Sequence, residues 1–251
     1  MKTVTLDVAA LEYGYHQPLY DPISFHCRTG ETVAVLGANG RGKTTLLHTL
    51  IGAQAQLGGR IDSAHAIGFV PQSFSSPDYC VFDSVLMGRA AGIGTFNVPD
   101  ADDEKIALEA LALMGLDALA EHNVNTLSGG QRQLVLIARA LAMQCQTLIL
   151  DEPGAALDIY NQRRVLMLLH QLANQQHHSI IFSTHDPYHA LRIADKVLLL
   201  LPERRWIFGS KDDILTEENL LLAYGVPVRQ VQLEHHRALI PIFDLPAKAP
   251  Q

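Results

Sequence analysis

Cysteine, net positive charge and long hydrophobic runs are all scarce in this 251-residue chain. The three cysteines, Cys27, Cys80 and Cys145, are widely spaced and include no CxxC pair. This pattern favours reduced buried thiols and argues against a disulfide scaffold or a paired-cysteine zinc site. The formal net charge of −7 argues against a nucleic-acid partner, because binding to a phosphate backbone requires clustered Lys and Arg.

Signals for membrane crossing and secretion are also missing. The longest apolar run, at 197–201, is far shorter than the ~18–20 residues that cross a bilayer. Residues 1–7 lack the basic segment and sustained apolar stretch of a secretory signal. The sequence shows no internal repeat and no heptad array. We therefore expect a compact cytosolic protein whose role at any membrane depends on a partner.

Strand and helix signals alternate along most of the chain. Short, continuous runs of β-branched and aliphatic residues are typical of strands buried on both faces of a parallel sheet. Such runs occur at 32–36, 67–70, 147–150 and 179–183. Helical patterns occur at 45–50, 134–142 and 158–173. The alternation predicts an α/β fold with a parallel sheet.

The remaining segments predict additions to this sheet. Apolar and polar residues alternate around turn signals in the first 30 residues, which favours antiparallel strands. Residues 81–117 are rich in Ala, Leu and Met and predict a helical insertion. Residues 197–201 and 205–208 suggest a hairpin, and a late helix is expected to begin at Thr216.

A glycine-rich segment follows the strand predicted at 32–36. Residues 37–44, GANGRGKT, fit the phosphate-binding pattern GxxxxGK[ST] and lie between a strand and a helix, as that pattern requires. The glycines let backbone N–H groups converge on phosphate oxygens, and the helix N-terminus adds a favourable dipole. Lys43 supplies a positive charge, and Thr44 a hydroxyl for Mg²⁺. The predicted nucleotide-binding residues here are Gly37, Asn39, Gly40, Gly42, Lys43, Thr44 and Thr45.

Two carboxylates follow the strand predicted at 147–150. Asp151 and Glu152 stand at the strand end, where α/β sheets place ligands. We expect Asp151 to hold the metal through water, which leaves Glu152 as the general base or water-orienting group for attack on the γ-phosphate. The alternative, that Asp-Glu-Pro only terminates a strand, is disfavoured because the chain also has a phosphate-binding loop.

A third motif, LSGGQRQ at 127–133, distinguishes this chain from other proteins that have a phosphate-binding loop. Its serine hydroxyl and glycine N–H groups stand at a helix start and resemble a second anion cradle, although a plain helix cap is the alternative interpretation. With this motif, the chain resembles the ABC ATPases over essentially its whole length. The nucleotide-binding residues that the resemblance implies in this motif are Ser128, Gly129, Gly130 and Gln131.

The resemblance implies further site residues. Gln72 matches the glutamine that touches the metal site and links hydrolysis to a membrane partner, and Asp158 matches the D-loop aspartate at the nucleotide. His185 matches the switch histidine, which contacts the γ-phosphate. Either Tyr15 or Tyr13 matches the aromatic residue that stacks on adenine.

ATP and Mg²⁺ are the cofactors that the resemblance implies. The implied catalytic residues are Lys43, Gln72, Glu152 and His185, and the implied metal ligands are Thr44, Gln72 and Asp151. The resemblance also implies one domain over 1–251. A P-loop NTPase core with an antiparallel β region would occupy about 1–75 and 146–251, and a helical subdomain about 76–145.

Two positions depart from the family pattern. Arg41 replaces the small residue usual before the last glycine of the phosphate loop, and Gly154-Ala155 replaces the usual Thr-Ser. Neither change removes a phosphate, metal or catalytic ligand, so we expect hydrolysis to be intact. Ala155 removes only a hydrogen bond that a serine there would make across a dimer.

Partner subunits are also implied by the resemblance. Family members meet head to tail, so Ser128 and Gly130 of one subunit would close over ATP held by Lys43 of the other. The implied assembly is a homodimer bound to integral-membrane permease subunits. A periplasmic or surface substrate-binding protein would act on it indirectly.

The segment FDSVLMGR at 82–89 indicates the kind of ABC machine. It resembles importer ATPases for iron–siderophore, haem, cobalamin and related metal or oxyanion cargo. Residues 74–89 would then receive the permease's coupling helix. The segment 69–77 and the pair Thr95-Phe96 look closest to the molybdate/tungstate type. We therefore expect the subunit of a bacterial importer at the cytoplasmic face of the inner membrane.

Three alternatives have different functions. A soluble ABC ATPase of DNA repair or translation is disfavoured by the single cassette, the lack of heptads and the acidic charge balance. An exporter commonly has membrane helices fused to the cassette, and none is evident in this sequence. A cassette that binds ATP without hydrolysing it is disfavoured by intact Lys43, Asp151, Glu152 and His185.

Overall fold

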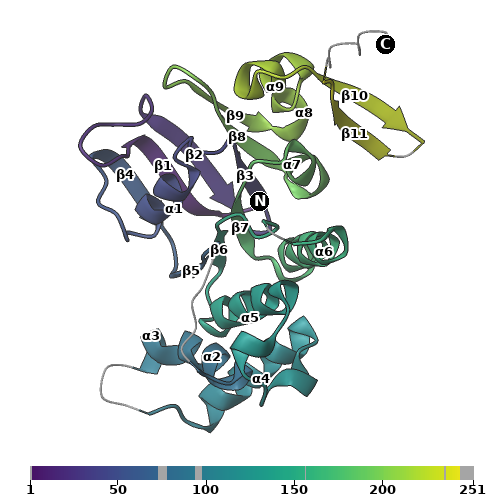
Figure 1. Ribbon diagram of the computed structural model, residues 1–251. Helices are drawn as coiled ribbons and strands as arrows, with labels where there is room; N and C mark the ends of the chain where they lie inside the picture. The colour runs from purple at the N-terminus through teal and green to yellow at the C-terminus, as the bar shows by residue number, and fades with distance from the viewer. Residues whose placement is uncertain (1, 73–77, 94–97, 156, 235, 244–251) are drawn as a thin grey trace.

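The computed structural model describes residues 2–72, 78–93, 98–155, 157–234 and 236–243. At its centre is a six-stranded sheet with the strand order β5-β6-β7-β3-β8-β9 (Figure 1). All neighbouring strands are parallel except β8 and β9, which are antiparallel. The strands are β3 (Thr32–Leu36), β5 (Ile67–Val70), β6 (Thr147–Leu150), β7 (Ser179–Thr184), β8 (Lys196–Leu200) and β9 (Trp206–Ser210). The α/β fold class, the four parallel strands and the late hairpin are confirmed.

The register of this sheet brings three loops to one edge. β3, β6 and β7 consist entirely of buried residues, as their continuous apolar character predicts. Leu36 at the end of β3 pairs with Thr184 at the end of β7, and Leu150 at the end of β6 pairs with Phe182. Because the strands are parallel, the chain leaves all three at the same edge. The loops that follow them carry Lys43, Glu152 and His185 toward a common point.

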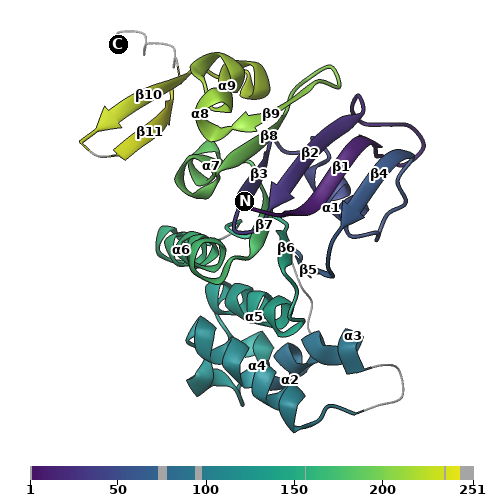
Figure 2. The same cartoon turned by 180° about the vertical axis from the view of Figure 1, so that it is seen from behind.

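A second, antiparallel sheet with the strand order β2-β1-β4 lies beside the first (Figure 2). Its strands are β1 (Val4–Glu12), β2 (Ile23–Arg28) and β4 (Gly58–Ser63). Helix α1 (Lys43–Leu50) packs between the two sheets, and its Leu46 and Leu47 are fully buried among apolar side chains from both. The antiparallel region predicted for the first 30 residues is confirmed, and burial of α1 fixes the start of this helix beside β3.

A group of helices lies at the opposite end of the molecule from the C-terminal strands (Figure 1). Its members are α2 (Val81–Leu86), η1 (Met87–Arg89), α3 (Ala90–Ile93), α4 (Ala101–Met114), η2 (Asp117–Leu119), η3 (Val124–Thr126) and α5 (Gly129–Ala142). Ala107, Leu111 and Met114 of α4 are buried in the core shared with α2 and α5. The described part of the Ala/Leu/Met-rich segment is therefore mainly helical, as predicted, and packs part of its apolar side chains inward.

Three expectations from the sequence fall partly or wholly outside the described residues. The permease-contact segment predicted at 74–89 and the molybdate-type segment at 69–77 both extend into 73–77, which is not described. The pair Thr95-Phe96 lies within 94–97, which is not described either. The boundaries proposed for a helical subdomain at about 76–145 stay a prediction.

The C-terminal third adds helices and a hairpin to the sheet. Its elements are α6 (Ile159–Gln176), α7 (Pro187–Ile193), α8 (Lys211–Ile214), α9 (Glu217–Tyr224), β10 (Val228–Leu233) and β11 (His236–Pro241). Thr216 caps α9 by accepting a hydrogen bond from the Asn219 N–H at 3.2 Å, which confirms the helix start predicted there. The antiparallel pair β10–β11 was not predicted.

Cys27 and Cys145 are buried, as the sequence predicts, whereas Cys80 is partly exposed. Cys27, Cys80 and Cys145 are free, and burial raises the pKa of Cys27 to about 12 and that of Cys145 to about 11. Within the described part of the chain, no helix combines the length and apolar character needed to span a membrane.

Candidate nucleotide-binding and hydrolysis site

The loop between β3 and α1 has a backbone that only glycine adopts readily. Gly40 and Gly42 both have φ of 76°, in the left-handed region. A Cβ atom on Gly42 would lie 2.8 Å from the Leu19 side chain, which would have to shift to accept a larger residue. Gly42 precedes α1 without a side-chain cap, which leaves the first N–H groups of the helix available for an anion.

Lys43 is held at the centre of this loop. Its side chain is 5% exposed, and its ammonium donates to the carbonyl oxygens of Gly37 at 2.9 Å and Ala38 at 3.2 Å. The Glu152 Oε1 atom lies 3.2 Å from the same Nζ atom. An ammonium has three protons, and these three acceptors account for all of them. Lys43 is therefore fixed where it can exchange one of these acceptors for a phosphate oxygen.

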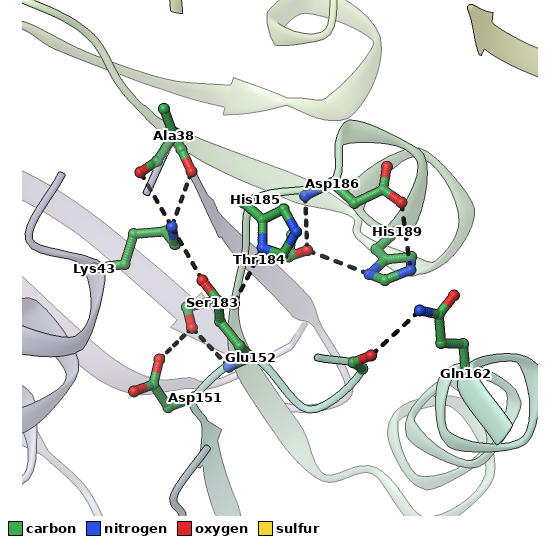
Figure 3. A network of polar contacts seen from close by, with 12 residues as sticks. Ala38, Lys43, Asp151, Glu152, Gln162, Ser183, Thr184, His185, Asp186 and His189 are labelled. Atoms are coloured by element: carbon green, nitrogen blue, oxygen red, sulfur yellow. Dashed lines mark hydrogen bonds and ion pairs between the residues drawn. The ribbon is translucent and has the colours of Figure 1, made fainter. Parts of the chain in front are cut away.

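Glu152 lies between Lys43 and His185 (Figure 3). His185 donates through Nδ1 to the second carboxylate oxygen, Oε2, at 3.0 Å. The backbone of Glu152 has φ of 43°, a strained region for this residue, and its N–H donates to Ser183 Oγ at 2.8 Å. This turn aims a carboxylate that is 12% exposed toward the phosphate loop.

Asp151 is more deeply buried than Glu152 and lies behind it. Its carboxylate accepts a 2.6 Å hydrogen bond from the Ser183 hydroxyl, and its N–H donates to Val70 O at 2.9 Å. The residue is 2% exposed. Ser183 therefore joins both carboxylate residues to the end of β7. Sequence analysis missed Ser183, although a polar residue at the end of an apolar strand beside His185 is the signal that would have indicated it.

The phosphate loop forms one wall of a cavity of about 460 Å³. The described residues that line it are Tyr15, Leu19, Asn39, Gly40, Arg41, Gly42, Lys43, Thr44, Thr45, Gln72 and Glu152. The structure thus gathers most of the predicted phosphate, metal and catalytic residues around one space. Leu19 is an addition that the sequence did not indicate, and its side chain lies beside the position that a Cβ atom on Gly42 would occupy.

Tyr13 and Tyr15, the two candidates for stacking on adenine, have different environments. Tyr15 lines the cavity and is 73% exposed, whereas Tyr13 is fully buried. The Tyr13 ring stacks on Tyr20, with 6.1 Å between ring centroids, and burial raises the pKa of its hydroxyl far above the usual range. A ring inside the core has no free face, so Tyr15 is the tyrosine that a planar base can reach.

Arg41, the departure in the phosphate loop, lines the same cavity. Its guanidinium lies beside the Tyr20 hydroxyl and counteracts the rise in the pKa of Tyr20 that burial causes. The substitution therefore adds a positive charge beside the loop and removes none of the phosphate-binding groups.

The signature residues form a separate cluster. Ser128 accepts from the Gln131 N–H at 3.3 Å, while Gln131 Oε1 accepts from the Ser128 N–H at 3.0 Å, which makes a capping box at the start of α5. A Cβ atom on Gly130 would lie 2.5 Å from Asn161, whose N–H is capped by Asp158 at 2.7 Å. Among the described residues that line the cavity, none comes from 128–131 or 158.

The fold and the geometry of the loops define a P-loop ATPase, and comparison with known proteins identifies its family. The chain belongs to the ABC transporter family, whose pattern matches residues 20–155. It is 42% identical to the molybdate import ATP-binding protein MolC of Haemophilus influenzae, with 96% of each chain covered. It is 33% identical to the manganese transport system ATP-binding protein MntB of Bacillus subtilis, with 90% of this chain and 93% of the other covered.

A solved structure is similar to this chain over nearly its full length. It belongs to an inward-facing ABC transporter of the metal-chelate type and superposes with a TM-score of 0.91 at 42% identity. The match covers 96% of this chain and 98% of that chain. The protein is accordingly an ATP-binding subunit of the ABC family, and it hydrolyses ATP.

Proposed function

We propose that the chain powers an importer for a metal chelate or an oxyanion such as molybdate or tungstate. The observation that supports this most strongly is the 42% identity, over 96% of both chains, to a subunit that imports molybdate. The TM-score of 0.91 to a transporter of the metal-chelate type points to the same group. The subunit would act at the cytoplasmic face of the inner membrane, bound to a separate permease that a substrate-binding protein supplies.

The proposed reaction is in-line attack of water on the γ-phosphate of ATP. The N–H groups of the loop before α1 and the Lys43 ammonium bind the phosphates, and Glu152 accepts a proton from the attacking water. His185, bonded to Glu152 at 3.0 Å, would hold the carboxylate in place and contact the γ-phosphate. Tyr15 would stack on the adenine ring.

Mg²⁺ fits the donors that the site offers. The Thr44 hydroxyl, the Gln72 side-chain oxygen and the Asp151 carboxylate are oxygen ligands, which Mg²⁺ prefers, and Thr44 and Gln72 line the cavity. Asp151 keeps one oxygen bonded to Ser183, a geometry suited to a contact through water. When bound, the ion would neutralise charge on the β- and γ-phosphates.

A homodimer is the proposed active unit. The separation of the capped helix start at Ser128 from the cavity that holds Lys43 supports two half-sites, each completed by a second copy of the chain. ATP would favour the closed dimer, and hydrolysis would favour the open dimer. This alternation would drive the permease between two orientations. No observation favours the alternative of a soluble ATPase in DNA repair or translation.

Affinity purification of the tagged chain from detergent-solubilised membranes tests the importer assignment. We expect a many-helix permease as the dominant co-purifying protein in mass spectrometry. Its retention should survive Glu152→Gln, which changes chemistry and leaves the surface unchanged. Ribosomal or DNA-associated partners without any membrane protein would refute the importer while leaving ATP hydrolysis unaffected.

A further inference from the structure

A buried histidine lies directly behind the catalytic loops. His189, in the first turn of α7, is 8% exposed and belongs to none of the phosphate-binding, carboxylate or signature motifs. Its Nδ1 atom is 3.3 Å from Thr184 Oγ1, and Thr184 immediately precedes His185 (Figure 3). The Cε1–Nδ1 edge of the ring also faces Gly154, two residues beyond Glu152. The imidazole therefore lies against both the end of β7 and the loop after β6.

Thr184 and Asp186 are the polar residues beside the two ring nitrogens of His189. Thr184 Oγ1 accepts from the Asp186 N–H at 3.1 Å and can donate its own proton to Nδ1. A neutral ring with its proton on Nε2 would direct that proton toward the Asp186 carboxylate, 3.6 Å away. Burial lowers the pKa of His189, which favours this neutral form.

The imidazole ring of His189 leaves little room for a side chain at Gly154. The backbone of Gly154 is outside the left-handed region, so its conformation does not require glycine. A Cβ atom there would lie 3.1 Å from His189 Cε1, closer than ordinary van der Waals contact. Gln162 of α6 donates to Gly154 O at 3.3 Å and Leu157 O at 3.1 Å, so the segment has limited freedom to move away. Gly154 and His189 thus form a complementary pair.

We propose that His189 is a positioning residue for ATP hydrolysis. Its bond to Thr184 orients the backbone that carries His185. Its contact with Gly154 holds that backbone at a fixed position relative to Glu152. The two loops then present Glu152 and His185 to the γ-phosphate as one unit. The inference rests on hydrolysis at the site described above and is independent of the cargo and the permease.

Substitution of His189 by two amides tests the bond to Thr184. Asparagine places an acceptor oxygen near the position of Nδ1, whereas glutamine places its polar atoms near Nε2. We expect His189→Asn to keep kcat near the wild-type value, and His189→Gln and His189→Ala to lower it roughly two- to tenfold, the effect of one neutral hydrogen bond. KM for ATP should stay unchanged, because His189 does not line the nucleotide cavity. Equal activity of the Asn and Gln variants would refute the proposed bond.

A double-mutant cycle tests the pair. Gly154→Ala alone should lower kcat, because the new methyl group displaces the imidazole ring. In the His189→Ala background the ring is gone, so adding Gly154→Ala should lower kcat no further. Losses that simply multiply would overturn the coupling. Thermal unfolding of each variant separates misfolding from positioning, and if His189→Ala is unfolded, the Asn–Gln comparison decides. A wild-type chain without Mg²⁺-dependent hydrolysis would instead contradict the ATPase assignment.

Discussion

Glu152→Gln is the substitution with the largest expected effect on chemistry and the smallest on shape. Glutamine retains the volume and one acceptor oxygen but is a far weaker base. A positioned general base contributes about 10²- to 10⁴-fold, or about 3–5 kcal/mol, so kcat should fall by that factor. Lys43 keeps its bonds to the carbonyl oxygens of Gly37 and Ala38, and the glutamine amide oxygen can accept the third ammonium proton. Affinity for ATP should therefore change only a few-fold.

Two assays on the purified chain separate these effects. Steady-state phosphate release at saturating Mg-ATP gives kcat, and titration with a fluorescent ATP analogue gives the dissociation constant. Glu121→Gln is a matched control, because Glu121 is exposed and does not line the nucleotide cavity. Turnover near the wild-type rate in Glu152→Gln would show that Glu152 is not the base, and loss of ATP binding would show that its charge mainly supports Lys43.

Three further predictions concern other parts of the structure. Tyr15→Ala should raise KM for ATP several-fold through the loss of a stacking face, whereas Tyr13→Phe should leave KM unchanged; steady-state kinetics on both variants decides which tyrosine meets adenine. Ser128→Arg should leave ATP binding by the monomer intact but abolish ATP-dependent dimers in light scattering, and lost binding in the monomer would contradict the two-half-site proposal. Burial lowers the pKa of His178, so the unfolded state binds more protons, and the free energy of unfolding should fall as the pH drops through about 6.5. Thermal unfolding at pH 7.5 and 5.5 should show a smaller decrease for His178→Gln than for the wild type, and an equal decrease would contradict this assignment.

Motifs formed by neighbouring residues could be predicted from the sequence. The phosphate loop combines Gly40 and Gly42, which supply the left-handed backbone, with Lys43 and Thr44 within a few positions. The paired carboxylates at Asp151 and Glu152 follow a short strand that ends in three apolar residues. In both cases, the local pattern contains the chemistry and the strand that positions it. The fold class followed from the same alternation of strand and helix.

Features that depend on contacts distant in sequence could not be predicted in this way. Ser183 joins Asp151 and Glu152 across two strands, and the fit of His189 against Gly154 depends on α7 packing beside the loop after β6. The choice between Tyr13 and Tyr15 required knowing which ring enters the core. The hairpin β10–β11 lacks the fully buried strand pattern, because most of its residues are partly or fully exposed.

Uptake by cells that lack this chain is the most direct test of its function as the ATPase of an importer. Accumulation of labelled molybdate, tungstate and a ferric chelate would be measured in such cells and after expression of the wild-type chain or Glu152→Gln. We predict that uptake of one of these cargoes is lost, that the wild type restores it and that Glu152→Gln does not. Unchanged uptake of every cargo, or full restoration by Glu152→Gln, would contradict a role for ATP hydrolysis by this chain in import.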